Sequence, residues 1–553
     1  MSKKVRFLIE DFHDFERTKE DDIECEPKII PGISKRKLLE LFFDPRYFTD
    51  IRIFRQEKIG DTCYTVQSDL TEWKTSYKFN RSFPVFSDKF AEADVDYRTP
   101  RQVLKKLKGI VGVLRRTVST DGVDYDVTVE LRSRFDKRDK PYFLLTMLSS
   151  VLQGDVEYTT DNVVGEKKNL FGFLSVFLFR NALKKAYSSG LYRTYVRRGY
   201  NDPKLRGAID IPRHIRLNVG RNDSRIAYNS RELTVDNPLN HLILRTWEML
   251  SRTYPESAHS IIGNAGEFRD IINVLRSSVG AAVMPLERCA AKCVRPITGP
   301  IYIDYEELRK LCLSILSFQA GANFFGGNEG PVSGLLFYSP DLWEFYIEKC
   351  MKERLGEMGR GLRSQEAMNI YSGEIADGLD PPYRQEIRPD YVFFTDKENP
   401  VPYMILDAKF RLFEKKFKAF GNKENEVPWS EAPASLDDVT KLMRDMMCFN
   451  TMSGGFVFPS DNEEFRKDKE KVRVHYISEY NKEQLIYIFV LSIPDVPEAD
   501  AAANSEERQY SEWAKRLDEN VDAMIKSLKT ALENELRYRA QLPEKRTRDK
   551  GLC

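Results

Sequence analysis

Residues 383–410, YRQEIRPDYVFFTDKENPVPYMILDAKF, carry the pattern that decides the fold of the C-terminal half of the chain. Apolar and polar residues alternate over 384–393, which predicts a half-buried β-strand. The middle of the stretch is rich in Asp, Lys, Glu, Asn and Pro, which favours a turn. Residues 403–410 are apolar up to Asp407 and predict a second strand. Because Pro389 cannot donate a hydrogen bond to a ladder, we expect it at an edge, bulge or bend.

A hairpin of these two strands would bring Asp390 close to Asp407 and Lys409, which lie two residues apart and therefore share a face. Two carboxylates and a lysine are the minimum set for a nuclease that uses Mg²⁺, with Mn²⁺ as a substitute. Mg²⁺ takes oxygen ligands, lowers the pKa of a bound water and neutralises charge on a phosphate. The lysine would orient that water or stabilise the developing charge. A cation would also relieve the repulsion between two buried acids.

The acid-x-Lys spacing alone is a weak signal, because most such pairs are solvated surface residues. What distinguishes Asp407 and Lys409 is their place at the end of an apolar strand, after a strand that carries Asp390. The same spacing starts elsewhere at Glu26, Glu72, Glu166 and Glu414.

Length and composition narrow the number of domains, the location and the kinds of partner only broadly. A chain of 553 residues holds two to four domains, and its net charge of +1 gives no sign of a nucleic-acid partner. No apolar run of about 18 residues and no secretory signal occurs, so we expect no membrane span and a cytoplasmic location. The eight cysteines form no CxxC pair, which favours reduced thiols over a zinc site. No GxxxxGK[ST] motif is present, so any nucleotide would be bound by a partner.

The order of the predicted elements indicates an α/β chain, α+β overall, with a mixed central sheet in its C-terminal core. An acidic block within residues 1–30 is expected as a solvated or flexible segment. We divide the chain into a mixed α/β domain (1–160), a mainly helical region (161–330), the core with the hairpin (331–500), and a long amphipathic helix with a basic tail (501–553).

Several elements are predicted individually. Thr99 and Pro100 mark a helix start, as do Ser339 as N-cap and Pro340 in the first turn. A Gly-rich loop at 321–331 marks a domain boundary. Further helices are predicted at 34–43, 170–187, 436–449 and 505–538, and further strands at 123–131, 455–458, 472–477 and 485–491.

A basic segment within 191–225 is a candidate nucleic-acid surface. Between residues 192 and 225, nine Lys and Arg residues face three Asp residues, a local charge of +6, and tyrosines are interleaved. Basic and aromatic residues together suit a phosphate backbone with stacked bases. The alternatives are a surface for a protein partner or salt bridges within the fold. The candidate DNA contacts are Arg193, Arg197, Arg198, Arg206 and Arg213.

A run of motifs resembles the McrC family, the nuclease subunits of McrBC-type, modification-dependent restriction systems. The resemblance covers roughly residues 120–460, and a related group of McrC-like nucleases shares much of the pattern. The motifs are, in order, LYRTY (191–195), LRGAIDIPRHI (205–215), DNPLNHLILRTW (236–247), LWEFYIEK (342–349), RPD (388–390), LDAKF (406–410) and DDVTKL (437–442).

The resemblance implies a PD-(D/E)xK endonuclease core in which Asp390, Asp407 and Lys409 form the catalytic triad. It adds Glu344 as a further metal-binding acid, and Lys441 stands where the family commonly has Gln on a helper helix. It also implies an AAA+ GTPase partner, McrB-like, whose hydrolysis the chain stimulates in antiviral defence. Residues 1–160 and 191–216 are the regions expected to contact that motor.

Two other functions stay open from the sequence. The chain could serve as an activator or scaffold of the motor, with its acids purely structural. It could also be a nuclease that acts alone on branched or single-stranded DNA. The sequence shows no pocket for a modified base, so it does not predict which DNA modification is recognised.

Overall fold

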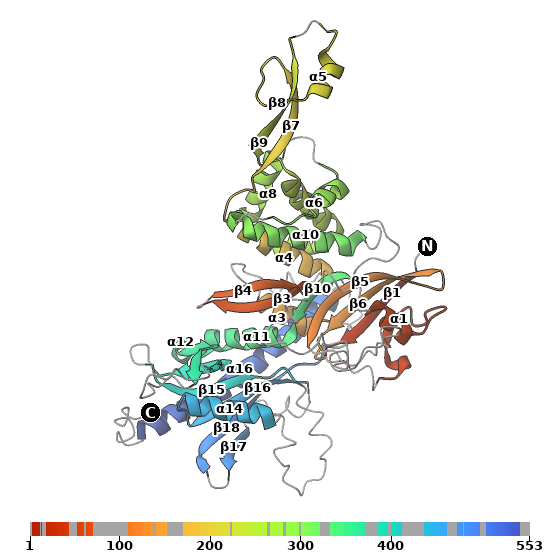
Figure 1. Ribbon diagram of the computed structural model, residues 1–553. Helices are drawn as coiled ribbons and strands as arrows, with labels where there is room; N and C mark the ends of the chain where they lie inside the picture. Colours follow the sequence, from red (N-terminus) through yellow and green to blue (C-terminus); the bar gives the residue numbers. More distant parts are fainter. Residues whose placement is uncertain are drawn as a thin grey trace, which may run out of the picture.

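The molecule is built in layers (Figure 1): a three-stranded arm, a group of helices, a seven-stranded sheet and a six-stranded sheet, in that order. The computed structural model describes residues 3–541 except 12, 14–17, 44–51, 60–61, 70–108, 137–139, 152–169, 222–223, 263–265, 280–283, 298–299, 321–331, 371–384, 396–399, 412–435, 462–472, 479–480 and 498–504. The predicted helix start at Thr99, the loop at 321–331 and the basic tail beyond residue 541 therefore lie outside the described residues.

The seven-stranded sheet is mixed, with strand order β2-β1-β6-β5-β10-β3-β4. Its member β10 (Ser333–Tyr338) pairs antiparallel with β5 and parallel with β3, although 218 residues separate Ser333 from Arg115 beside it. A strand that we assigned to the C-terminal core thus completes the N-terminal sheet. The other strands are β1 (Lys3–Glu10), β2 (Glu24–Glu26), β3 (Arg52–Ile59), β4 (Thr62–Asp69), β5 (Ile110–Thr120) and β6 (Val123–Arg132).

The described acids of the N-terminal block lie on or next to β1, η1 and β2 and are exposed at positions 10, 20–22, 24 and 26, with Asp11 buried, so the expectation of a solvated face is confirmed for this part of the block. The apolar residues of β1 alternate inward against β6, because Val5, Phe7 and Ile9 are buried. The sheet is accompanied by the 3₁₀ turn η1 (Glu20–Asp22) and by the helices α1 (Lys35–Phe42) and α3 (Tyr142–Val151).

The middle region is mainly helical, as predicted, and the first eleven residues of α4 (Leu170–Tyr187) are all buried. No helix in the described part of the chain is long and apolar enough to span a membrane. The other helices of this layer are α6 (Pro238–Thr253), α7 (Pro255–Ile262), α8 (Gly266–Ser278), α9 (Leu286–Lys292) and α10 (Ile303–Ala320), with the short η6 (Pro300–Tyr302).

An arm projects from this helical layer on the side away from both sheets (Figure 1). It consists of β7 (Thr194–Asp202), β8 (Ala208–Ile209), the helix α5 (Ile211–Asn218) and β9 (Ile226–Thr234). The central strand β9 pairs antiparallel with β7 on one side and with β8 on the other. The predicted basic segment is therefore a β-structured arm.

The six-stranded sheet is the mixed sheet predicted for the C-terminal core, with order β11-β14-β15-β16-β18-β17. The pairs β15–β16 and β16–β18 are parallel, and the remaining pairs are antiparallel. Its strands are β11 (Leu362–Ser364), β14 (Tyr391–Phe394), β15 (Pro402–Ala408), β16 (Ser453–Ser460), β17 (Arg473–Ser478) and β18 (Asn481–Ser492).

Helices cover both faces of this sheet. The helix α14 (Leu436–Cys448) packs on one face, and α11 (Ser339–Arg354) and α16 (Ser505–Gln541) pack on the other, between the two sheets. Tyr391 and Phe393 accordingly face α11 and α16, whereas Val392 faces α14. The half-buried strand that we predicted is thus buried on both faces, because α14 closes the second one.

The first predicted strand, over 384–393, is divided into two at its proline. β13 (Gln385–Ile387) pairs with β12 (Met368–Ile370) in a separate two-stranded sheet, and the chain enters the main sheet only at β14. Pro389 lies between β13 and β14, outside both ladders and directly before a bend at Asp390, as the expectation of an edge, bulge or bend requires. The short helix α12 (Glu357–Arg360) completes this region.

Candidate functional site

The β14–β15 hairpin brings together the acids that the sequence analysis selected. Tyr391 pairs with Leu406, which places Asp390 beside the end of β15. The Asp390 Oδ2 atom accepts a hydrogen bond from the backbone N–H of Ala408 at 2.8 Å. Asp407 is 4 % exposed, so its carboxylate is almost wholly removed from water.

Two ammonium groups converge on these carboxylates. Lys409 Nζ lies 2.5 Å from Asp407 Oδ2 and 3.3 Å from Asp438 Oδ1. Lys441, on α14, places its Nζ atom 2.6 Å from Asp407 Oδ1 and 3.8 Å from Asp390 Oδ1. Two lysines thus face two acids at the end of the hairpin. Lys441, the residue that the resemblance places on a helper helix, lies close to both Asp390 and Asp407.

The electrostatics of the cluster follow from its burial. Burial raises the pKa of Asp390 well above its ordinary value, and the negative charges of Asp407 and Glu344 raise it further, against the opposing lysines. Burial alone would lower the pKa of Lys441, but the carboxylates of Asp390 and Asp407 outweigh it and raise that pKa. Lys441 therefore stays protonated and offsets part of the negative charge of the pair.

Glu344 stands one layer away, on α11. Its Oε1 atom accepts a hydrogen bond from Gln365 Nε2 at 2.7 Å, and its backbone carbonyl accepts one from the Tyr391 hydroxyl at 2.6 Å. Glu344 is close enough to raise the pKa of Asp390, yet its carboxylate is engaged with Gln365. Its role as a metal ligand stays a prediction.

The structure adds two residues that the sequence analysis did not assign to the site. Gln365 has a φ of +50° and links Glu344 to Asp390 by donating its own backbone N–H to the Asp390 carbonyl at 3.0 Å. Asp438, near the start of α14, receives Lys409 and also Arg411, whose Nη1 lies 2.6 Å from Asp438 Oδ2. Gln365 belongs to no local pattern that points to chemistry, whereas Asp438 lies in the DDVTKL motif, to which the sequence analysis gave no role for this acid.

The donor set fits a divalent cation held through oxygen atoms. No cluster of three or more His, Cys, Asp and Glu side chains suited to a metal occurs in the described ranges, so the protein would supply the two carboxylates of Asp390 and Asp407. This suits Mg²⁺, which binds through one or two carboxylates and fills its shell with water and substrate oxygens. Asp407 Oδ2 is buried and lies 2.5 Å from Lys409 Nζ, so a bound cation would share this oxygen with the ammonium group.

The five arginines proposed for DNA contact lie on the arm or just before it, and two of them are engaged within the protein. Arg198 forms an ion pair with Asp236 at 2.7 Å. Arg213 donates to the carbonyl of Tyr200 at 2.5 Å and lies so close over β7 that a Cβ atom on Gly199 would meet its Nη1 at 1.9 Å. DNA contact stays a prediction for the other three, which are exposed: Arg193, Arg197 and Arg206.

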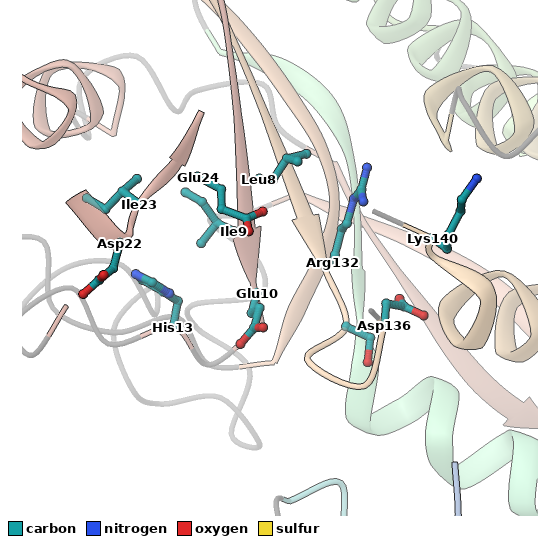
Figure 2. A pocket seen from close by; sticks show the side chains of 11 residues that line it. Leu8, Ile9, Glu10, His13, Asp22, Ile23, Glu24, Arg132, Asp136 and Lys140 are labelled. Atoms are coloured by element: carbon teal, nitrogen blue, oxygen red, sulfur yellow. The ribbon is translucent and has the colours of Figure 1, made fainter. Parts of the chain in front are cut away.

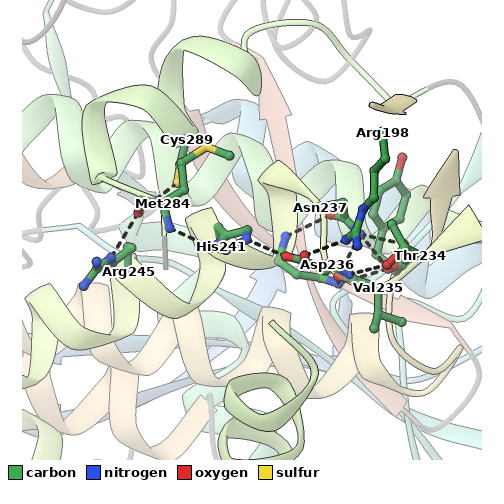
Figure 3. Close-up of polar contacts among 11 residues, drawn as sticks. Arg198, Thr234, Val235, Asp236, Asn237, His241, Arg245, Met284 and Cys289 are labelled. Carbon is green, nitrogen blue, oxygen red and sulfur yellow. Dashed lines mark hydrogen bonds and ion pairs between the residues drawn. The ribbon is translucent and has the colours of Figure 1, made fainter. Parts of the chain in front are cut away.

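The root of the arm is a network of hydrogen bonds made by the DNPLNH motif (Figure 3). Asn237 caps α6 by accepting from the Asn240 N–H at 3.1 Å, and its amide donates to the Tyr192 carbonyl at 3.0 Å. His241 Nε2 lies 2.8 Å from Asp236 Oδ1, and its Nδ1 accepts from the Met284 N–H at 3.1 Å. The motif thus anchors the arm strands to the helical layer.

A cavity of about 470 Å³ lies in the N-terminal layer, away from the acid–lysine cluster. Figure 2 shows its lining, which comes from β1, from the segment around η1 and β2, and from the end of β6 with the residues that follow it. Asp136 lines this cavity; its Oδ1 accepts from the Phe143 N–H at 2.8 Å, while its buried Oδ2 has no hydrogen-bond partner. Burial raises the pKa of Asp136 to about 8.

The Asp136→Asn variant is expected to gain stability relative to the wild type as the pH rises from 5 to 9. The folded state binds the Asp136 proton more tightly than the unfolded state. The free energy of unfolding of the wild type therefore falls as the pH rises from the ordinary pKa of an Asp to about 8, whereas the asparagine of the variant has no proton to lose. That cost grows by no more than about 1.4 kcal/mol per pH unit. Thermal unfolding midpoints measured across this range check the prediction, with the exposed Asp21→Asn as control; equal pH profiles for both variants and the wild type would contradict it.

The fold and the site define the class of the protein: a mixed α/β chain with an acid–lysine cluster at the end of a mixed sheet that is covered on both faces. Within this class the chain belongs to the family described as McrBC 5-methylcytosine restriction system component, whose model matches residues 105–431, more than half of its length. The match ends before Lys441, and the comparison with curated proteins gives no match.

Two solved assemblies from Thermococcus gammatolerans are similar to the chain. A refined half-complex from a tetradecameric assembly of McrB AAA+ hexamers with bound McrC aligns at 14% identity and a TM-score of 0.41, over 93% of this chain and 100% of the other. A cryo-EM structure of the McrBC complex aligns at 15% identity and a TM-score of 0.26, over 64% and 88% of the two chains.

Proposed function

We propose that the chain is the nuclease subunit of a McrBC-type restriction system, and that it hydrolyses DNA phosphodiester bonds in a Mg²⁺-dependent reaction. The observation that carries the proposal is the convergence of Asp390, Asp407, Lys409 and Lys441 at the end of one hairpin. Membership of the restriction family, shown over residues 105–431, makes DNA the natural substrate of such a cluster.

Each residue has a role that its position supports. Asp390 and Asp407 would hold the cation, which when bound supplies positive charge at the phosphate and makes the attacking water more acidic. Lys409 would orient that water or donate to the phosphate oxygen as negative charge develops. Lys441 keeps Asp407 in place through its 2.6 Å ion pair and remains protonated because of the surrounding carboxylates.

Removal of the metal tests this function directly. The purified chain, mixed with the AAA+ GTPase of its own system, GTP and a methylated plasmid, is expected to cut DNA only in the presence of Mg²⁺ or Mn²⁺. Excess EDTA should reduce cleavage to the background level, and added Mg²⁺ should restore it. Cleavage that persists in EDTA would contradict the proposal, and calorimetric titration with Mn²⁺ measures binding to the same site independently of activity.

We further propose that the arm is a contact surface for the GTPase partner, which unites the nuclease with the activator role. Apolar side chains gather at β8 and α5 without a core to bury them: Ile209, Ile211 and Ile215 are 49%, 63% and 55% exposed. Exposed apolar clusters of this kind mark protein–protein contacts. Cleavage without any partner or nucleotide would instead favour a nuclease that acts alone.

A further inference from the structure

A buried arginine of the N-terminal sheet reaches the segment that follows the catalytic strand. Arg134 comes two residues after β6, and its Nη2 donates to the carbonyl of Phe410 at 2.7 Å. Its guanidinium also lies 5.5 Å from the centre of the Phe410 ring, a cation–π distance. Phe410 is 4 % exposed and directly follows Lys409.

Arg134 is itself held by Asp11, the residue after β1. Asp11 Oδ1 accepts from the backbone N–H of Arg134 at 2.9 Å and lies 3.9 Å from its Nε. Asp11 Oδ2 accepts from the hydroxyl of Ser339 at 2.9 Å. Asp11 is only 1 % exposed, so its hydrogen bonds with the Arg134 N–H and the Ser339 hydroxyl form away from water, where they are stronger.

Ser339 therefore acts differently from the N-cap that the sequence analysis expected. Tyr338 occupies the N-cap position of α11, and the Ser339 hydroxyl is turned to Asp11. Since α11 carries Glu344, Asp11 connects the N-terminal sheet to the site along two routes, one through Ser339 and one through Arg134.

The hydrogen bonds on either side of Lys409 show why the route through Arg134 matters for the position of this lysine. On the strand side, the Lys409 N–H donates to the Val457 carbonyl at 2.9 Å, which ties it to β16. On the other side, the carbonyl of Phe410 is held by Arg134, and its ring packs edge-on against Phe135 at 5.2 Å. The position of Lys409 is thus set partly by its own sheet and partly by the N-terminal sheet.

We propose that Arg134, oriented by Asp11, is a positioning residue that fixes Lys409 against Asp407 and thereby makes cleavage depend on the placement of the N-terminal sheet. This inference rests on the proposed nuclease function. A group that acts on a phosphate must be placed to within about 0.5 Å, and a 1 Å displacement can cost about 100-fold in rate. Loss of the Arg134–Phe410 bond would release one of the two sides that hold Lys409.

The test compares Arg134→Gln with Arg6→Gln in the full chain, assayed with its GTPase partner, Mg²⁺ and methylated DNA. Arg6 is a matched control, because its contacts with Glu26 and Glu130 remain within the same sheet. Arg134→Gln is expected to lower the single-turnover cleavage rate about 10- to 100-fold, as loss of outer-shell partners does elsewhere. Its affinity for DNA and its stimulation of the GTPase should remain within about twofold of wild type.

Hydrogen exchange gives a readout that does not depend on activity. Amide exchange in the peptide 403–411, which includes the Lys409 N–H, should become faster in Arg134→Gln and remain unchanged in Arg6→Gln. The inference is overturned when the wild type cuts DNA and Arg134→Gln cuts as fast as Arg6→Gln, or when exchange in this peptide is unaltered. If the wild-type protein never cuts DNA, that result contradicts the proposed function. Amide exchange in the peptide 403–411 then decides alone whether Arg134 holds the backbone around Lys409.

If Arg134→Gln does not fold, the variant Asp11→Asn tests the same inference. Its amide oxygen keeps an acceptor for the Arg134 N–H, while the charge that attracts the guanidinium is lost. We expect a smaller fall in cleavage, about 3- to 10-fold, with faster exchange in the same peptide. Wild-type rates and exchange in this variant would count against the coupling.

Discussion

Replacing Asp407 with alanine is expected to lower DNA cleavage by more than about 100-fold, since even the outer-shell partners of a metal site cost 10- to 100-fold when removed. Asp407 receives both Lys409, at 2.5 Å, and Lys441, at 2.6 Å, so its loss removes a proposed metal ligand and the partner of two ammonium groups at once. Mn²⁺ affinity measured by calorimetry should fall in parallel with cleavage.

The same variant separates the two proposed roles of the chain. Stimulation of the partner's GTPase should remain at wild-type level, because the arm lies in a different layer from the cluster (Figure 1). Loss of the closest carboxylate to two buried lysines is destabilising, so Asp407→Asn, which keeps the shape of the side chain, is the companion variant. Cleavage that remains undiminished in both variants, with normal thermal unfolding, would remove Asp407 from the site.

The sequence was most informative where structure is local. The hairpin and the pair Asp407 and Lys409 follow from period-two alternation and a turn, which depend only on neighbouring residues. Lys441 came from the family resemblance, and the structure places it against Asp407 because α14 packs on the β15–β16 face. The long amphipathic helix is also a periodic signal, and α16 follows it over Ser505–Gln541.

Long-range pairing is what the sequence did not predict. From its sequence alone, the apolar run of β10 could belong to the N-terminal sheet or to the C-terminal core. Its pairing with β5 places it in the N-terminal sheet. Gly334 permits that pairing, because a Cβ there would meet the Val113 carbonyl oxygen at 2.1 Å. Arg134 and Phe410, 276 residues apart, likewise belong to no common motif.

The arm was missed for a different physical reason. Residues of β7 alternate between half-buried and exposed, so neither face shows the apolar stripe that marks a strand on a core. Its motif residues instead make turns and close contacts: Asp210 caps α5 by accepting from the Arg213 N–H at 3.2 Å, and Gly207 allows β8 to approach β9. Such residues are recognised as structural only once the strands are paired.

The double variant Ile211→Asp, Ile215→Asp is expected to abolish stimulation of the partner's GTPase and, with it, partner-dependent cleavage. The two residues are four apart on α5 and therefore share one face, and they are 63% and 55% exposed. Their substitution should leave the thermal unfolding midpoint almost unchanged, because exposed positions contribute within about 0.5 kcal/mol.

The size of the effect follows from what a charge does in an apolar contact. An anchor residue of an interface contributes about 2 kcal/mol or more, so two of them weaken binding by about 1,000-fold. The control is the pair Ile301→Asp, Ile303→Asp, in which the isoleucines are 73% and 65% exposed but lie in the helical layer. We expect the control to bind and stimulate the partner normally, as measured by GTP hydrolysis and by co-sedimentation. Full stimulation by the α5 variant would show that the motor docks elsewhere, and since Asp407 is intact in it, Mn²⁺ binding should persist whichever result is found.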